Sequence, residues 1–289
     1  MIDTLKTTKE LLKRYNMIAK KSFGQNFLVD DGILESISNT AVLNKEDLII
    51  EIGPGLGNLT YYLKEKCYLL LFEIDKRMIE VLNYRFKDEK NIKLLNSDIL
   101  KVNIDEEIDK LEKEVGRKFG TVKVIANLPY YITSPILFKL LQESKKVEEI
   151  VVMVQNEVAD RILAKPCNKD YGVLSIMVDY LADSKKEIIV PSTSFIPMPN
   201  VTSAVIKITK RKKYDIQDEK VFVELVHKAF ANRRKKMINS LEINGFLNMD
   251  KEKLNNIFER FELSASVRAE ELDTDKYVKI ANYIASNII

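Results

Sequence analysis

Residues 48–60 read Leu48-Ile49-Ile50-Glu51-Ile52-Gly53-Pro54-Gly55-Leu56-Gly57-Asn58-Leu59-Thr60. An apolar run of strand length leads here into a glycine-rich turn, and the turn opens a stretch with helical spacing. Similar apolar runs follow along the chain, at Tyr68–Glu73, Ile92–Leu95, Val122–Ala126 and Ile150–Val154. Stretches long enough for a helix lie between them, at Leu59–Lys66, Lys76–Phe86 and Ser134–Glu143. Continuous apolar strands that alternate with helices predict an α/β fold with a parallel sheet covered on both faces.

The chain has 289 residues, which is long enough for two domains. Two more extended segments, Lys186–Val190 and Ala204–Thr209, flank a proline-rich stretch and predict an antiparallel pair at the sheet edge. Beyond residues 210–213, Lys-Arg-Lys-Lys, only helical spacing remains. We therefore predict a sheet domain over residues 1–211, with an N-terminal helix and a basic loop, and a small all-helical domain over residues 212–289.

Composition is that of a soluble globular protein, with 46% hydrophobic and 31% charged residues. The two cysteines form no Cys-x-x-Cys pair, so we predict no metal site. The first nine residues lack the apolar core of a signal peptide, and no apolar run reaches membrane-spanning length, which predicts a cytoplasmic protein. The net charge is only +3, but residues 207–236 hold 11 Lys/Arg against 4 Asp/Glu. This excess predicts a surface that faces phosphates, although a solvated helix face is the ordinary alternative.

The glycine turn predicts a nucleoside-like cofactor. Its spacing is Gly-x-Gly-x-Gly, which differs from the dinucleotide pattern, and no Walker lysine follows it. Glu73 ends the second strand, where a carboxylate can accept from both hydroxyls of a ribose, and Asp98 follows the third strand, where it can accept from an adenine amino group. Each acid alone is equally well explained as strand-end polarity. Together with Gly53 they favour a ligand without a pyrophosphate, such as S-adenosylmethionine.

The tetrapeptide Asn127-Leu128-Pro129-Tyr130 follows the fourth strand and predicts a site for a flat base. The Asn127 side-chain oxygen and the Leu128 carbonyl can accept from an exocyclic amine, which returns electron density to a poorly nucleophilic nitrogen. Tyr130 can stack on the base, and Phe195 in the Phe-x-Pro-x-Pro loop can close its other face. The plain alternatives are a strand that ends in a proline turn, and for Phe195 a hydrophobic plug at the domain junction.

The order of these motifs resembles the ribosomal RNA adenine N6,N6-dimethyltransferases, most closely the bacterial small-subunit (16S) branch. The resemblance runs from about Lys20 to the C-terminus. It is carried by these stretches: Phe23-Gly24-Gln25-Asn26-Phe27-Leu28, residues 51–57, residues 127–130, Phe195-Ile196-Pro197-Met198-Pro199, and Ala229-Phe230-Ala231-Asn232-Arg233-Arg234-Lys235-Lys236. The position after the Phe-x-Pro-x-Pro motif is usually basic in this family, and here it is Asn200.

The resemblance implies a class I (Rossmann-like) S-adenosylmethionine-dependent methyltransferase sheet with a small all-helical C-terminal domain. It implies dimethylation of two adjacent adenosines near the 3′ end of small-subunit ribosomal RNA during ribosome assembly, with a pre-30S particle as partner. It also implies cofactor contacts at Asn26, Leu28, Gly53, Glu73, Asp98 and Asn127. The catalytic residues would be Asn127, Leu128, Tyr130 and Phe195. For RNA contacts we predict Lys20, Lys21, Arg233, Arg234, Lys235 and Lys236, and we expect a monomer.

Three other functions are weighed against this one. A large-subunit (23S) resistance methyltransferase would share the chemistry, but the Ala-Phe-x-x-Arg-Arg-Lys run from Ala229 favours the small-subunit branch. A non-catalytic RNA-binding assembly factor would share the fold, and the intact set of cofactor residues argues against it. A DNA adenine methyltransferase ranks lowest, because Asn-Leu-Pro-Tyr differs from the Asn/Asp-Pro-Pro-Tyr form of many such enzymes.

Overall fold

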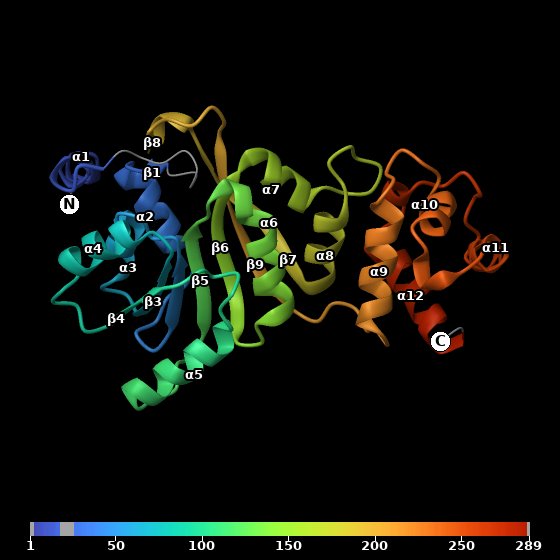
Figure 1. Cartoon of the computed structure of the whole chain (residues 1–289), viewed down its shortest axis with the longest axis horizontal. Helices are drawn as coiled ribbons and strands as arrows, with labels where there is room; N and C mark the ends of the chain where they lie inside the picture. The colour runs from blue at the N-terminus through green and yellow to red at the C-terminus, as the bar shows by residue number, and fades with distance from the viewer. Residues whose placement is uncertain (1–2, 18–25, 288–289) are drawn as a thin grey trace. The chain divides into compact units, whose positions relative to one another are not determined.

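The computed structural model describes residues 3–17 and 26–287, and these divide into two compact units (Figure 1). The first unit comprises residues 1–159 and 185–210, and the second comprises residues 160–184 and 211–289. The chain passes between the units three times, and the boundary predicted from sequence, between residues 211 and 212, lies one residue beyond the last of these points. The segment Asp160–Ser184 was assigned to the first domain from sequence and belongs instead to the second unit.

The first unit is built on a seven-stranded sheet. Its strand order is β4 (Ile92–Asn96), β3 (Tyr68–Glu73), β2 (Leu48–Ile52), β5 (Val122–Asn127), β6 (Val147–Gln155), β9 (Ser203–Lys210) and β7 (Ala182–Val190). The first five strands in this order are parallel, and β9 runs antiparallel to β6. The predicted α/β class is confirmed, and β7 lies next to β9 at the sheet edge. The order reverses at β2, since the chain adds β3 and β4 on one side and then crosses back to add β5 on the other.

Both faces of the sheet are covered, as the unbroken apolar strands predicted. Ile49 packs in one core cluster with Leu34 of α2 (Asp31–Thr40) and Leu63 of α3 (Asn58–Leu63). The neighbouring residue Ile50 faces the opposite side and is equally buried. Because every residue of β2 is buried, this strand forms the centre of the first unit.

Polar caps set where several helices begin. Asp30, Asp75 and Asn103 each accept a backbone hydrogen bond from the first turn of α2, of α4 (Lys76–Arg85) and of α5 (Ile104–Val115), respectively. The predicted helix over residues 134–143 is divided into α6 (Thr133–Phe138) and a π-helical turn, η3 (Lys139–Glu143). The remaining elements of this unit are α1 (Thr4–Arg14), β1 (Phe27–Leu28), η2 (Tyr130–Ile132), η4 (Ser192–Ser194) and β8 (Phe195–Ile196).

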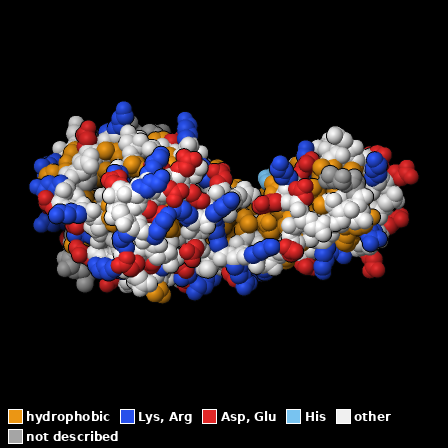
Figure 2. Space-filling model, turned by 90° about the horizontal axis from the view of Figure 1, so that it is seen from below, with side chains coloured by type: hydrophobic (Ala, Val, Ile, Leu, Met, Phe, Trp, Pro, Cys, Tyr) orange, Lys and Arg blue, Asp and Glu red, His pale blue; other side chains and the backbone are white. Residues whose placement is uncertain are grey.

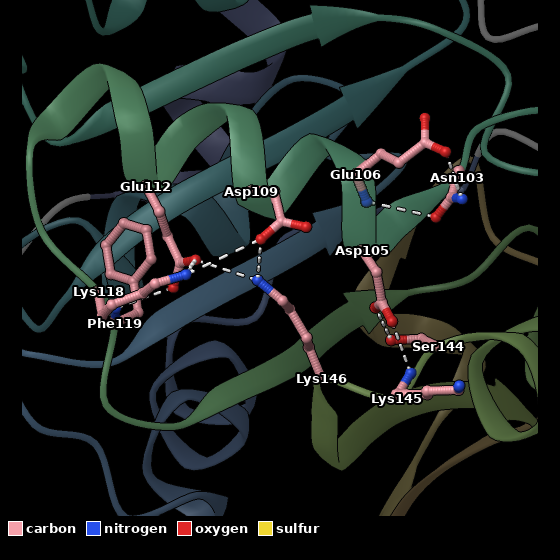
Figure 3. A network of polar contacts seen from close by, with 10 residues as sticks. All are labelled: Asn103, Asp105, Glu106, Asp109, Glu112, Lys118, Phe119, Ser144, Lys145 and Lys146. Carbon is pink, nitrogen blue, oxygen red and sulfur yellow. Dashed lines mark hydrogen bonds and ion pairs between the residues drawn. The ribbon is translucent and has the colours of Figure 1, made fainter.

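A polar network fastens α5 to the turn before β6 (Figure 3). Lys146 donates to Asp109 at 2.6 Å and to Glu112 at 3.0 Å, and Lys118 contacts Glu112 at 2.7 Å. Burial opposes the charge on Glu112, but the hydrogen bonds from the two lysines hold its pKa at about 2. Asp105 accepts from Ser144 in the same network. The network therefore holds α5 beside the strands that form the site.

The second unit is helical and packs around aromatic side chains. Its helices are α8 (Val173–Leu181), α9 (Glu219–Phe230), α10 (Met237–Ile243), α11 (Lys251–Arg260) and α12 (Thr274–Asn287), with the short turns η5 (Phe246–Asn248) and η6 (Ala269–Glu271). α7 (Asn156–Leu163) spans the division between the units. The ring of Tyr180 on α8 lies 4.7 Å from that of Phe222 on α9, and the Tyr171 hydroxyl donates to the Leu272 carbonyl. These contacts explain why Asp160–Ser184 joins the second unit. No pattern in the sequence predicts them. Within the described ranges, no helix has the length and apolar character needed to cross a membrane.

Gly57 packs closely against side chains at the end of α4. It caps α3 with a φ of +77°, and a Cβ atom there would lie 2.6 Å from the Phe86 ring and 2.9 Å from the Leu82 side chain. Gly116 has nearly the same φ, +72°, but nothing lies within 4 Å of a Cβ atom at that position. The two glycines share the backbone requirement and differ in the space around them.

We expect Gly57→Ala to destabilise the protein more than Gly116→Ala. Both substitutions cost about 1–2 kcal/mol because of the left-handed backbone, and Gly57→Ala adds an overpacking cost of about 1–3 kcal/mol. Urea unfolding of both variants measures the difference in the free energy of unfolding. If both variants lose the same free energy of unfolding, α4 shifts to make room for the added methyl group at no cost.

Candidate active site

The ends of four parallel strands bring the predicted cofactor residues to one place. Ile50 pairs with Val124 and Ile52 with Phe72, so the chain leaves β2, β3 and β5 at the same level. Gly53, Glu73 and Asn127 follow at this level, and Asp98 lies in the loop after β4. They line one cavity of about 240 Å³, together with Asn26, Leu28, Leu128 and Tyr130. The cavity lies at the topological switch point, where open α/β sheets bind ligands.

Glu73 anchors the glycine turn as well as lining the cavity. Its Oε2 accepts from the Gly55 backbone N–H at 3.0 Å, and its Oε1 accepts from the Asp75 N–H at 2.8 Å. Burial raises the pKa of Glu73, and hydrogen bonds from the backbone N–H groups of Asp75, Gly55 and Ile74 act in the opposite direction. The carboxylate is thereby oriented before any ligand arrives, and it retains acceptor capacity for a hydroxyl group.

The Asp98 loop offers a mixed polar and apolar wall. Asp98 Oδ1 accepts from the Leu100 N–H at 3.0 Å, and the Ser97 N–H donates to the Glu73 carbonyl at 3.0 Å. Ile74 and Leu100 line the same cavity and are 52% and 36% exposed. A carboxylate between two accessible apolar side chains suits a flat heterocycle that carries an amino group.

The tetrapeptide 127–130 is held from both sides. The Leu128 N–H donates to the Met153 carbonyl of β6 at 3.2 Å, which ties the turn to the sheet. Asn127 uses its Nδ2 to donate to the Asn26 carbonyl at 3.4 Å, so its Oδ1 is the atom of that amide left to accept. Tyr130 lines the cavity, and its hydroxyl lies 2.7 Å from Ser203 Oγ. The site thus contains the predicted acceptor and aromatic groups.

Phe195 is a core residue and does not line this cavity. β8 pairs with β1, so Phe195 lies opposite Leu28 in an antiparallel bridge. The Phe195 side chain is only 3% exposed and belongs to the core cluster that contains Leu34 and Leu59. The role expected for Phe195, closing the second face of a base, therefore stays a prediction, and in this structure its ring packs in the core opposite Leu28. The accessible aromatic side chain at the cavity is Tyr131, which is 58% exposed and which the sequence analysis did not select.

Asn58 is a second residue that the sequence analysis missed. It is buried at the cavity wall and donates through Nδ2 to the Leu28 carbonyl and to Thr8 Oγ1, both at 2.9 Å. Its Oδ1 accepts from the Arg85 guanidinium at 3.1 Å. Asn58 thus joins α1, the Asn26–Leu28 segment and α4. Its place directly after the glycine turn was the available signal.

Glu51 is the most strongly perturbed acid at the cavity. It is fully buried at the end of β2, and its Oε2 accepts from Thr60 Oγ1 at 2.7 Å. Burial raises the pKa of Glu51 to about 8, and the neighbouring Glu73 carboxylate adds to the rise. The Thr60 hydrogen bond and the positive charge of Arg85 act the other way. A proton is therefore held beneath the glycine turn near neutral pH.

The basic segment that follows α9, residues 233–236, contains one cation that is bound within the protein and three that are exposed. Arg233 Nε donates to Glu270 Oε2 at 2.6 Å, and its NH2 donates to the Asn168 carbonyl, so Arg233 holds a loop of the second unit together. Arg234, Lys235 and Lys236 are exposed, and no ion pair joins them to a described residue. Lys20 and Lys21 lie outside the described residues.

Most of the other basic residues between 207 and 236 are bound internally. Ion pairs join Lys207 to Glu149, Arg211 to Asp183, Lys212 to Asp215 and Lys213 to Asp179. Lys210 is half-buried and donates to the Ser144 carbonyl at 2.6 Å. The face shown in Figure 2 carries intermingled basic and acidic side chains. Fewer cations are therefore available to bind phosphate than the excess of Lys and Arg in residues 207–236 predicts.

The comparisons with known proteins agree with this geometry. The family model of the ribosomal RNA adenine dimethylases matches residues 16–286. The chain belongs to this family. The ribosomal RNA small subunit methyltransferase A of Lactococcus lactis is 42% identical, over 97% of this chain and 95% of the relative. The enzyme of the same name from Clostridioides difficile is 42% identical over 97% and 96%.

Two solved structures share the fold over most of the chain. A dimethyladenosine transferase from Plasmodium falciparum has a TM-score of 0.74 at 25% identity, covering 89% of this chain and 96% of the other. The 23S rRNA methyltransferase ErmE has a TM-score of 0.63 at 21% identity, covering 89% and 98%. The resemblance noted from the sequence is confirmed. This family member is a methyltransferase that uses S-adenosylmethionine and acts on ribosomal RNA.

We expect Glu51→Gln to remove one component of the pH dependence of stability. The folded chain keeps the Glu51 proton up to about pH 8, whereas the unfolded chain loses it above about pH 4.5. The free energy of unfolding therefore falls by up to about 1.4 kcal/mol per pH unit within this window. Glutamine is uncharged and can still accept from Thr60, so the variant should lack this slope and be more stable than the parent at pH 8.

Urea unfolding of both proteins at pH 5, 6, 7 and 8 measures the difference. Glu80→Gln, at an exposed position on α4, is the matched control and should keep the slope of the parent. Parallel curves for Glu51→Gln and the parent would contradict a bound proton at Glu51.

Proposed function

We propose that this protein dimethylates N6 of two adjacent adenosines near the 3′ end of small-subunit (16S) ribosomal RNA during assembly of the small subunit. One observation carries the proposal: a single cavity holds both the glycine and carboxylate residues suited to a nucleoside cofactor and the acceptor groups of residues 127–130. Transfer of a methyl group from one ligand to another requires that the two ligands bind side by side, with the methyl donor and the acceptor nitrogen in contact.

The cofactor half of the site comprises Asn26, Leu28, Gly53, Glu73, Asp98 and Asn127. Glu73 would accept from the ribose hydroxyls, since its two oxygens are already oriented by backbone N–H groups. Asp98 would accept from the adenine amino group, with Ile74 and Leu100 against the ring. When bound, S-adenosylmethionine supplies an activated methyl group with a good leaving group. The chain's part is then to place the acceptor nitrogen in line with that group.

The acceptor half of the site comprises Asn127, Leu128 and Tyr130. Asn127 Oδ1 and the Leu128 carbonyl would accept from the target amine, which favours a pyramidal nitrogen and stabilises its developing positive charge. Tyr130 would stack on the base after the base leaves its helix. This chemistry needs no strong general base. The single histidine of the sequence, His227, lies on α9 in the second unit.

The choice of RNA rests on the relatives and on the exposed cations. The relatives of 42% identity carry the name of small-subunit enzymes, which supports the small-subunit substrate over the large-subunit one. Arg234, Lys235 and Lys236 would contact phosphates of that RNA, with Lys20 and Lys21 as further candidates. We propose that the protein acts as a cytoplasmic monomer on a pre-30S particle, without a metal ion. Among the described residues no cluster of three or more possible metal ligands is present.

We expect Asn127→Ala to abolish methyl transfer and to leave RNA binding intact. Loss of the side-chain acceptor should lower the rate at least about 100-fold. Cells that lack this protein should lose dimethyladenosine from small-subunit RNA, as measured by mass spectrometry. The parent gene should restore the modification and Asn127→Ala should not. Asn39→Ala, at an exposed position on α2, is the control and should restore it.

Unchanged dimethyladenosine in cells without the protein would overturn the proposed function. Full methylation by Asn127→Ala would overturn only the role of its amide. In vitro, unmethylated small-subunit particles should be modified, whereas naked large-subunit RNA should not.

We expect the triple substitution Arg234→Gln, Lys235→Gln and Lys236→Gln to weaken RNA binding roughly tenfold. Each lost phosphate contact removes about 0.7 from the slope of log affinity against log salt, so the slope should fall by about two. Lys220→Gln, Lys251→Gln and Lys253→Gln remove the same charge from exposed positions of the second unit and serve as the control. Filter binding between 50 and 300 mM salt measures both, and equal slopes would return the segment to an ordinary solvated surface.

A further inference from the structure

The hydroxyl group of Tyr130 hydrogen-bonds with a buried serine that is distant in sequence. It lies 2.7 Å from Ser203 Oγ, across 73 residues of sequence. Tyr130 is the first residue of η2 and follows Pro129. The turn itself is closed by the Ile132 N–H and the Thr133 hydroxyl, which both donate to the Pro129 carbonyl at 3.2 Å. These bonds fix the backbone of the turn and leave the direction of the Tyr130 ring to be set elsewhere.

Ser203 is held within the sheet. It is the first residue of β9, has no exposed surface, and pairs with Gln155 of β6. The preceding residue, Thr202, accepts from the Asn156 N–H at 3.0 Å. The Ser203 hydroxyl therefore has a defined position on the sheet. A hydrogen bond to it can hold the hydroxyl end of a tyrosine side chain in place.

The hydrogen bond spans the full length of the ring. A tyrosine side chain turns about two bonds, and a contact at its hydroxyl end restrains both. Tyr130 lines the cavity, and the hydroxyl at the far end of its ring is held by Ser203. A stacking platform held in this way needs no reorientation when a base enters.

We propose that Ser203 is a positioning residue for the methyl acceptor: its hydroxyl holds the Tyr130 ring in the orientation in which the target adenine stacks. The inference rests on the proposed function and adds to it a residue that touches neither cofactor nor base. The same hydrogen bond links the base-binding turn to the strand that follows the Phe195–Pro199 loop.

The test compares Ser203→Ala, Tyr130→Phe and the double variant on unmethylated small-subunit particles. Each single substitution removes the hydrogen bond and keeps the tyrosine-type ring, so each should lower kcat/KM by roughly fivefold to tenfold. The double variant should fall no further than the single ones, because one interaction is lost in all three. Ser38→Ala removes an equally buried serine hydroxyl from α2 and should leave kcat/KM unchanged.

A second measurement separates positioning from a general loss of structure. An RNA oligonucleotide with 2-aminopurine at the target position loses fluorescence when that base stacks on an aromatic ring. Ser203→Ala should weaken this quenching, while the affinity for S-adenosylmethionine, measured by calorimetry, should stay at the parent value. If Ser203→Ala folds poorly, Tyr130→Phe removes the same hydrogen bond by deleting the tyrosine hydroxyl, and its quenching and kcat/KM then test the proposal.

Parent-like quenching and kcat/KM in both single variants would overturn the proposal, as would additive losses in the double variant. The failure of the proposed function has a different signature. The parent protein would then transfer no methyl group to small-subunit particles, whereas the quenching measurement would still report whether Ser203 orients Tyr130.

Discussion

The parallel pairing of β2 with β5 is the constraint on which the site depends. Its register places Gly53 and Asn127 at the same level, three residues beyond the pair Ile50 and Val124. A shift of one residue would turn the side chains of β5 to the opposite face and remove Asn127 from the cavity. At the other end of the strands, Asp47 accepts from the Thr121 N–H and from Lys123, which secures the same register.

Around this register the protein builds a preorganised cavity from residues that serve two purposes. Glu73 orients the glycine turn while it faces the cavity, and Asn58 holds the Asn26–Leu28 segment in place. Tyr130 forms a wall and is itself held by Ser203. Because these groups are ordered by the protein, less ordering remains to be done when the ligands bind.

The basic stretch of residues 207–236 shows where reasoning from composition is limited. An excess of lysine and arginine in sequence predicted a broad surface for phosphate, yet most of these cations pair within their own unit. A run of charged residues does not show which of its members already has a partner, because several of the partners lie far away along the chain. Glu270, which binds Arg233, is 37 residues distant. The exposed cations of this stretch without an ion pair to a described residue are Lys220 and the three-residue segment 234–236.

The sequence by itself determined the class of fold, the strand ends that form the site and the chemistry of that site. Apolar runs, glycines and a proline turn act on the local backbone, so the sequence alone is enough to interpret them. Only the tertiary structure decided that Phe195 lies in the core, that Asp160–Ser184 joins the helical unit, and that Ser203 meets Tyr130. Each of these depends on pairing between distant segments, and local pattern carries no information about which distant segment will be the partner.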